Sequence, residues 1–161
     1  MQKLAGDRSI ADMTIRVPHP YEVGMAEKWI KTHSGEFKKG REAVFAIERR
    51  SRKRIIGAVG LTIDGENRNA ELGYWVGKRY RNMGYATEAA ELMLMYGFEE
   101  LNLNRIHAHH FSRNPASGRV LEKIGMKKEG KLRQHAFKWD SFEDLVLYGI
   151  LREEYFAGLQ S

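Results

Sequence analysis

Cysteine is absent from this sequence of 161 residues. The chain therefore has no disulfide, no thiolate nucleophile and no cysteine-based metal site, a composition that fits an intracellular, cytoplasmic setting. It also has no run of about 18 apolar residues, the length that crosses a bilayer, and no signal-peptide pattern at its start. Because repeats, linkers and low-complexity stretches are missing as well, we expect one domain over residues 1–161 and no membrane partner.

Two familiar nucleotide-binding motifs are also missing. There is no Gly-x-x-x-x-Gly-Lys-Ser/Thr, so the chain has no Walker loop. There is no Gly-x-Gly-x-x-Gly with an acidic residue about 20 positions later, which disfavours a dinucleotide fold. Lys and Arg outnumber Asp and Glu by 27 to 21, and this basic balance suits an anionic partner. The basic residues are dispersed, so no DNA partner is expected, and their densest run, residues 49–54, is predicted to be a solvated hairpin tip.

The hydrophobic pattern of the first half predicts short helical turns, one helix and three strands. The turns are expected around Leu4 and Ile10, and the helix is expected to begin at Pro20 and to pack one face inward. Residues 43–48, 55–63 and 70–76 are predicted to form an antiparallel meander. Gly57 and Gly60 inside the second strand indicate a bulge or close backbone packing.

The second half predicts helices and strands in alternation. A helix over residues 85–101 leads to a strand over 105–109, so a parallel crossover is expected. A second helix opens at residues 114–117 and stops at Gly125. Residues 126–137 and 142–151 are predicted to form an antiparallel pair, followed by a short helical turn in the tail.

The stretch from Arg81 to Glu88, Arg-Asn-Met-Gly-Tyr-Ala-Thr-Glu, joins the strand over 70–76 to the helix over 85–101. A loop that enters a helix directs unpaired backbone N–H groups and the positive end of the helix dipole into one space. Such a space binds phosphate, and Gly84 removes a Cβ where an anion would approach. Lys78 and Arg79 place further positive charge nearby. An ordinary strand-to-helix loop with a solvated basic rim is the alternative interpretation.

Several motifs occur together in an order that resembles the GNAT acetyltransferase superfamily. They are Ala-Glu-Leu-Gly-Tyr-Trp-Val (70–76), Gly-Tyr-Ala-Thr-Glu-Ala (84–89), Asn-x-x-Ser (114–117), Val-Leu-Glu-Lys-Ile-Gly-Met (120–126) and Asp-Leu-Val-Leu-Tyr-Gly (144–149). They are most similar to the RimJ/RimL branch, the ribosomal-protein N-terminal acetyltransferases, and the match spans about Pro18 to Tyr155. The resemblance implies an α+β GNAT fold: a mixed, mostly antiparallel sheet, splayed between the fourth and fifth family strands, with helices on both faces.

One family element has no counterpart in this sequence. Members of the branch usually begin with a strand of the Arg-Leu-x-Leu-Arg kind, whereas this chain begins within the region of the first family helix. A misplaced start or a trimmed chain would give the same sequence. If the sheet lacks that strand, its edge is open to pairing with another chain. A homodimer is therefore a hypothesis for this protein.

The resemblance implies that acetyl-CoA is the co-substrate and that its acetyl group passes to a primary amine by direct attack in a ternary complex. The acceptor would be a protein N-terminal amine or a small-molecule amine. Backbone amides around Gly84 would hold the diphosphate, and groups near Val76 would pair with the pantetheine arm and support an oxyanion, provided that the strands part beyond Val76. The candidate cofactor-binding residues are Trp75, Val76, Arg79, Arg81, Asn82, Met83, Gly84, Tyr85, Ala86, Thr87, Asn114 and Ser117.

Two residues are candidates for catalysis. Glu71 lies where a glutamate often serves the family as general base, and a structural ion pair is its alternative role. Ser117 is the hydroxyl available to polarise the departing sulfur, since residues 114–121 contain no Tyr. Its alternative is a local backbone hydrogen bond. Asn114 could contact the pantetheine arm, cap the helix, or do both.

Histidines and tryptophans complete the candidates. On a strand, His107 and His109 share a face while His110 points away. Two such ligands without a nearby carboxylate or Cys make a poor zinc site, so no metal is expected. His135 is a further candidate base on the acceptor side, and Trp75 and Trp139 could shape an acceptor groove.

Two functions besides acetyl transfer stay open from the sequence. One is a CoA-binding regulatory domain without turnover, because the chain has a serine in place of the usual acid and its base is uncertain. The other is an RNA-binding module, although the chain lacks the interleaved aromatic and basic platform that single-strand binding uses.

Overall fold

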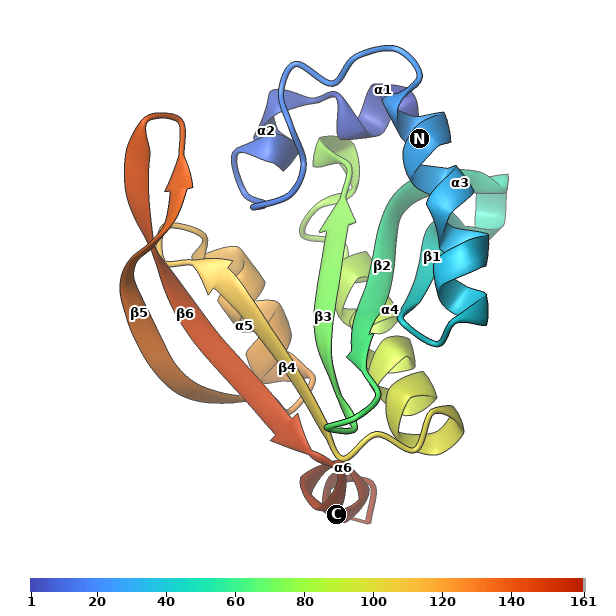
Figure 1. Cartoon of the computed structure of the whole chain (residues 1–161), viewed down its shortest axis with the longest axis vertical. Helices are drawn as coiled ribbons and strands as arrows, with labels where there is room; N and C mark the ends of the chain where they lie inside the picture. The colour runs from blue at the N-terminus through green and yellow to red at the C-terminus, as the bar shows by residue number, and fades with distance from the viewer. Residues whose placement is uncertain (161) are drawn as a thin grey trace.

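The computed structural model describes residues 1–160, which fold into one mixed sheet with helices on both faces (Figure 1). The strands are β1 (Glu42–Arg49), β2 (Arg54–Asp64), β3 (Asn69–Val76), β4 (Arg105–Phe111), β5 (Lys127–Lys138) and β6 (Ser141–Leu151). The helices are α1 (Gln2–Ala5), α2 (Arg8–Ala11), α3 (Met25–Lys38), α4 (Tyr85–Met95), α5 (Pro115–Lys123) and α6 (Arg152–Gly158). Short helical turns η1 (Arg50–Arg52), η2 (Lys78–Tyr80) and η3 (Tyr96–Glu100) complete the set.

The strands lie in the order β1-β2-β3-β4-β6-β5, and β3 and β4 are parallel while the other neighbours are antiparallel. This confirms the predicted meander, the crossover through α4 and the final hairpin. The predicted irregularity in the second strand is also confirmed. Ile47 faces Gly57 while Glu48 faces Ile55, so Ile56 is an extra residue in β2. A Cβ on Gly57 would lie 2.2 Å from the carbonyl oxygen of Trp75, so glycine is required there.

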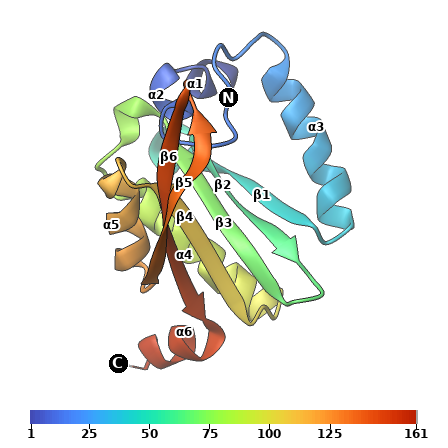
Figure 2. The same cartoon turned by 60° about the vertical axis from the view of Figure 1, so that its left-hand side comes forward.

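The hydrophobic core lies between the sheet and the helices α4 and α5. Leu94 and Phe98 pack there against Leu61 and Ile106 of the sheet, and all four are at most 1% exposed. Figure 2 shows α3 on the opposite side of the sheet from α4 and α5. We call the α3 side the front face and the α4 side the back face.

The prediction for the helix after Pro20 was wrong in two respects. The helix α3 begins at Met25, because Gly24 at its N-cap has a φ of +87°, outside helical geometry. The inward-packing face is also shallower than predicted: Ala26 is buried, Trp29 and His33 are partly buried, and Ile30 and Val23 are 48% and 98% exposed. The reason is that α3 borders a cavity on the front face, described below, and does not pack on a filled core.

The helix predicted over residues 85–101 is α-helical only as far as Met95. It continues as the π-helical turn η3, after which Leu101 N–H donates to Tyr96 C=O at 3.1 Å. The wider turn buries the consecutive residues Gly97 and Phe98 together. Gly97 is tightly placed, since a Cβ there would lie 2.6 Å from Ile106 Cδ1.

The outer edge of β1 and the basic run at residues 49–54 are both exposed features of the sheet. Within residues 1–160, no strand pairs with the outer edge of β1, so the usual first family strand is missing from this part of the chain. The basic run at residues 49–54 forms the exposed connection around η1, as predicted. No helix in the described chain is long and apolar enough to cross a membrane.

Candidate active site

The strands β3 and β4 pair only at their beginnings. Their register joins Asn69 to Arg105, Ala70 to Ile106 and Glu71 to His107, and then the two strands separate. The sequence analysis placed this parting beyond Val76. It begins earlier because β4 follows β6 along its whole length while β3 stays paired with β2.

The inner edge of β3 presents backbone donors to this gap. Gly77 N–H donates to Ile56 C=O on β2 at 2.8 Å. Because successive residues of a strand direct their backbone groups to opposite sides, Tyr74 and Val76 direct theirs towards the gap. Arg81 Nε donates to Val76 C=O at 3.4 Å. The gap therefore offers a strand edge to an extended ligand.

A cavity of about 530 Å³ opens on the front face beside the gap. Gly60 and Gly73 belong to its lining and leave the sheet there without side chains. A Cβ on Gly73 would have nothing within 4 Å. Trp29 of α3 and Trp75 of β3 also line the cavity, and Trp139 is not part of the lining.

Glu71 and His109 both line this cavity. Arg16 Nη2 lies 3.4 Å from Glu71 Oε1, and Arg16 Nη1 donates to Thr62 Oγ1 at 3.4 Å. Glu71 thus has the ion-pair partner that the sequence analysis named as its alternative role. That partner is loose, because the Arg16 side chain is 68% exposed.

His109 was not among the catalytic residues predicted from the sequence. Burial lowers the pKa of His109, although the carboxylate of Glu71 acts to raise it. The imidazole is therefore neutral at pH 7 and able to accept a proton. The sequence did contain a signal, since alternation places His109 on the same strand face as His107, which faces Glu71 in register.

The other histidines have separate surroundings. His110 points to the back face, where Nδ1 lies 2.7 Å from Phe111 C=O and the side chain is buried. His135 is exposed on β5, and it is among the neighbours that lower the pKa of His109. Among residues 1–160, no three or more His, Asp and Glu side chains are grouped to hold a metal ion.

Ser117 lies on the back face, where it meets Tyr74. The two hydroxyl oxygens are 2.8 Å apart, and Tyr74 also donates to Ser117 C=O at 3.1 Å. Burial raises the pKa of Tyr74 to about 12, so the phenol stays protonated. Asn114 accepts from Ser117 N–H at 3.4 Å and caps α5. The sequence analysis missed Tyr74, because only the tertiary fold brings β3 to α5.

Replacing Tyr74 by Phe should change both titration and catalysis. The folded wild type should show a phenolate component near pH 12, and the Tyr74→Phe variant should lose it. Because Ser117 loses a hydrogen bond worth about 1 kcal/mol, kcat should fall by about threefold to tenfold. Ultraviolet phenolate absorbance and steady-state rates measure the two effects. A Tyr96→Phe variant, whose hydroxyl lies away from Ser117, is the control; equal kcat losses in both variants would contradict the role of Tyr74.

The predicted glycine turn enters α4 as expected. Gly84 is the N-cap with a φ of +83°, and no side chain caps the helix. The first helical bond runs from Glu88 N–H to Gly84 C=O at 3.0 Å, so the N–H groups of Tyr85, Ala86 and Thr87 have no acceptor within the helix. Asn82 before it is exposed with a φ of +60° and Met83 is 61% exposed. The turn is therefore exposed and its N–H groups are uncapped, and phosphate binding there stays a prediction.

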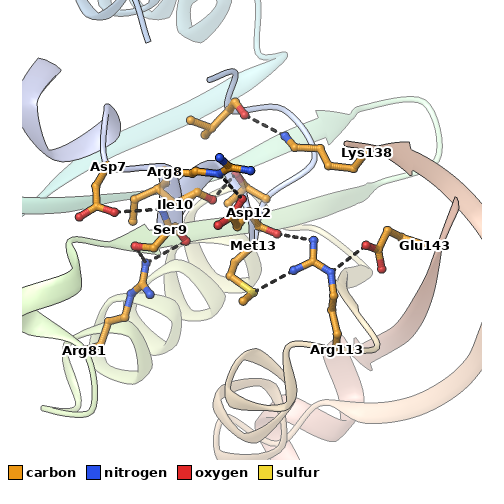
Figure 3. Close-up of polar contacts among 12 residues, drawn as sticks. Asp7, Arg8, Ser9, Ile10, Asp12, Met13, Arg81, Arg113, Lys138 and Glu143 are labelled. Carbon is orange, nitrogen blue, oxygen red and sulfur yellow. Dashed lines mark hydrogen bonds and ion pairs between the residues drawn. The ribbon is translucent and has the colours of Figure 1, made fainter. Parts of the chain in front are cut away.

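Three cationic side chains form hydrogen bonds with the segment before α3 (Figure 3). Arg81 Nη2 donates to Ser9 Oγ at 3.0 Å and to Ser9 C=O at 3.1 Å. Arg113 donates to Asp12 C=O at 2.6 Å. Lys138 Nζ, from the β5–β6 hairpin, donates to the carbonyls of residues 15 and 17 at 3.2 and 2.9 Å. We call residues 12–18 the wall segment, because residues 13–18 line the cavity.

The cations that were predicted to bind the diphosphate therefore differ in whether their side chains are free to reach a ligand. Arg79 and Lys78 are exposed beside the turn. The guanidinium of Arg81 is already engaged by Ser9. This bond could not be predicted from the sequence, because it joins residues 72 positions apart.

The chain is similar to a known family of proteins. The model of the acetyltransferase (GNAT) domain matches residues 1–127, so the match begins earlier than Pro18. The N-acetyltransferase YoaA of Bacillus subtilis (strain 168) is 34% identical over 131 residues, 81% of this chain and 74% of that protein. The [ribosomal protein uS5]-alanine N-acetyltransferase of Escherichia coli (strain K12) is 25% identical over 123 residues, 75% of this chain and 63% of that protein.

A solved structure extends the likeness to most of the chain. Spermidine N-acetyltransferase from Vibrio cholerae, in complex with CoA and spermine, superposes with a TM-score of 0.83 at 26% identity and covers 96% of this chain and 89% of that one. The parted strands and the open α4 N-terminus thus occur in a fold that binds CoA in that relative. The chain belongs to the GNAT acetyltransferase family and is an acetyl-CoA-dependent N-acetyltransferase that acts on amines.

Proposed function

We propose that the acceptor is a primary amine that enters the front cavity and attacks directly, with Glu71 and His109 at the point where β3 and β4 part. The parting of the two strands carries this proposal, because it joins the back-face gap to the front-face cavity. A donor bound from one side and an amine from the other would meet there.

The residues around the gap fit acetyl-CoA. The uncapped N–H groups after Gly84, with Arg79 beside them, suit a diphosphate. The backbone groups of Tyr74 suit the amides of a pantetheine arm, and Trp75, Asn114 and Ser117 border its path. When bound, acetyl-CoA supplies the thioester carbon that the amine attacks, with formation of a C–N bond and loss of the C–S bond. Val76 N–H would stabilise negative charge on the thioester oxygen.

Glu71 and His109 would handle the proton of the amine. A free amine has a pKa of about 8 to 10, so it is mostly protonated at neutral pH and needs a base. Glu71 attracts the ammonium group, and neutral His109 beside it accepts the proton. We therefore propose His109 as base with Glu71 as its charged neighbour, and Glu71 itself as the competing base.

Ser117 would serve the leaving group on the back face. A serine hydroxyl is a weak acid, so we assign it a hydrogen bond to the departing sulfur and no full proton transfer. Tyr74 is a positioning residue that orients Ser117 through the 2.8 Å contact. Asn114 fixes the same helical turn by capping α5.

The relatives suggest two kinds of acceptor. The name of one relative points to the N-terminal alanine of a ribosomal protein, and another was solved with spermine. Of the two, we propose the RimJ/RimL-type acceptor, an N-terminal amine, or a small amine that resembles it. The Arg16–Glu71 pair at the cavity supports this choice, because Arg16 offsets one of the two carboxylates, Glu42 and Glu71, that a polyamine would need.

Titration with acetyl-CoA tests the proposed function. The melting temperature should rise with ligand concentration, since each tenfold excess over Kd adds about 1.4 kcal/mol of stability. Addition of amines should then release CoA thiol. Stabilisation without thiol release from any amine would favour a regulatory CoA-binding domain. RNA binding with a steep salt dependence and no CoA binding would favour the RNA-binding module.

We also propose that two copies associate through the outer edge of β1. That edge has backbone groups without a strand partner in the described chain, which favours pairing. Sedimentation should show a dimer at micromolar concentrations, and Ala46→Pro in β1 should shift it to monomer because proline removes a backbone donor. A wild-type monomer across that concentration range would contradict the proposal.

A further inference from the structure

The front cavity has apolar walls that the acetyl transfer itself does not require. The wall segment contributes Met13 and Ile15, and α3 contributes Trp29. Met13 and Ile15 are 37% and 40% exposed although the cations described above hold their segment in place. Apolar side chains that stay exposed inside a cavity indicate a ligand with an apolar body.

The two carboxylates of the cavity lining lie in one row across three neighbouring strands. Glu42 of β1 faces Thr62 of β2, and Thr62 faces Glu71 of β3. The strand spacing sets the Cα atoms of Glu42 and Glu71 about 10 Å apart. Arg16 lies on Glu71 and Thr62, between them.

The charges in the cavity set the charge of the ligand. Two carboxylates and one guanidinium line it, Glu42, Glu71 and Arg16. His109 adds no charge while it is neutral. The net charge of these three groups is −1, which one positive group on the ligand would balance. A ligand with several ammonium groups would exceed this sum, because Glu42 and Glu71 could pair with two of them only if Arg16 left Glu71.

We propose that this cavity selects a monoamine: a primary amine with a single positive charge on a large apolar body. The ammonium group lies at Glu71, and the body lies over Gly73 between Ile15 and Trp29. Two sources share this chemistry, a free arylalkylamine and a polypeptide whose N-terminal residue has a large apolar side chain. The inference rests on the proposed function and narrows its acceptor class.

The two glycines of the cavity lining, Gly60 and Gly73, leave space for a large apolar body. Gly60 and Gly73 face each other on β2 and β3, so two neighbouring strands lack side chains at the same level. The open space above Gly73 lies beside Glu71, which is two residues earlier on the same strand. An aromatic ring that is joined to the amine by a short linker would lie in this space above Gly73 while the amine lies at Glu71.

A panel of amines with saturating acetyl-CoA tests the selection through CoA thiol release. It contains 2-phenylethylamine, ethylamine, spermidine, and two peptides that differ only in an N-terminal Phe or Gly. The aromatic member of each pair should have a kcat/KM at least about tenfold higher, and spermidine should be the poorest. A higher kcat/KM for 2-phenylethylamine than for the Phe peptide identifies a free amine as the source, and the reverse identifies a polypeptide.

Two variants locate the selection in the cavity. Ile15→Asp should lower kcat/KM for 2-phenylethylamine by about tenfold while it changes ethylamine by less than about threefold. Ile30→Asp is the matched control, since Ile30 is 48% exposed on α3 and lies outside the cavity lining. Gly73→Leu should act like Ile15→Asp, because a side chain there enters open space and leaves the fold intact.

The two possible failures can be told apart. If no amine releases thiol, the proposed function is wrong. If thiol is released but spermidine or the small amines have equal or higher kcat/KM, the monoamine selection is wrong and the proposed function stands. Unchanged preference in both Ile15→Asp and Gly73→Leu would likewise overturn the selection.

Discussion

Replacing His109 by Gln should lower kcat/KM by about 100-fold or more, the range that general-base catalysis contributes. Gln keeps the polar shape of the side chain but accepts no proton. Acetyl-CoA should still stabilise the variant, since His109 lines the front cavity and the proposed diphosphate site is the N-terminus of α4. Steady-state rates and thermal shift measure the two effects separately.

The pH profile separates His109 from Glu71. Burial places the pKa of His109 below its usual value of 6.5, so the wild-type rate should fall only as the pH drops below that value and protonates the base. His109→Gln should lose this acid limb. Glu71→Gln should keep the limb and move it to lower pH, because the negative charge of Glu71 raises the pKa of His109.

The contrary result is equally specific. If Glu71→Gln abolishes the acid limb and His109→Gln retains it, Glu71 is the base. His107→Gln is the control, because His107 lies on the same strand face but outside the cavity lining. Its rate should change by less than about threefold. The ionisation of the acceptor amine is the same for every variant, so it leaves the comparison unaffected.

The sequence predicts those features that depend on local chemistry. Alternation gives the three strands of the meander, and Gly57 marks the place where β2 bulges and approaches Trp75. Gly84 and Asn114 mark the beginnings of α4 and α5, because a positive φ and a capping amide are local signals. Both helix starts border the predicted CoA site.

Features that depend on tertiary contacts escape the sequence. Tyr74 has the same pattern as its buried neighbours in β3, and only the approach of α5 gives its hydroxyl a partner. Arg81 beside a glycine turn indicates a phosphate ligand, yet Ser9 engages it from a distant part of the chain. The helix α3 was expected to pack inward because its spacing is apolar, but only Ala26 is fully buried, whereas Trp29 lines the cavity and Ile30 is exposed.

Replacing Gly84 by Val should weaken acetyl-CoA binding by about 100-fold. Gly84 has a φ of +83°, which a β-branched residue avoids at a cost of about 1–3 kcal/mol. The backbone would relax and turn the N–H groups of Tyr85 and Ala86 away from the diphosphate. Loss of two hydrogen bonds to a charged group accounts for a change of this size. Calorimetric titration with acetyl-CoA measures it.

Gly40→Val separates this effect from backbone strain. Gly40 lies between α3 and β1, has a φ of +67° and, like Gly84, would give its Cβ nothing within 4 Å. Both variants should therefore lose a similar amount of stability, but only Gly84→Val should lose acetyl-CoA affinity. If both variants melt earlier and bind acetyl-CoA as tightly as the wild type, the N–H groups at α4 do not hold the diphosphate. The cofactor would then depend on other parts of the gap, such as the inner edge of β3.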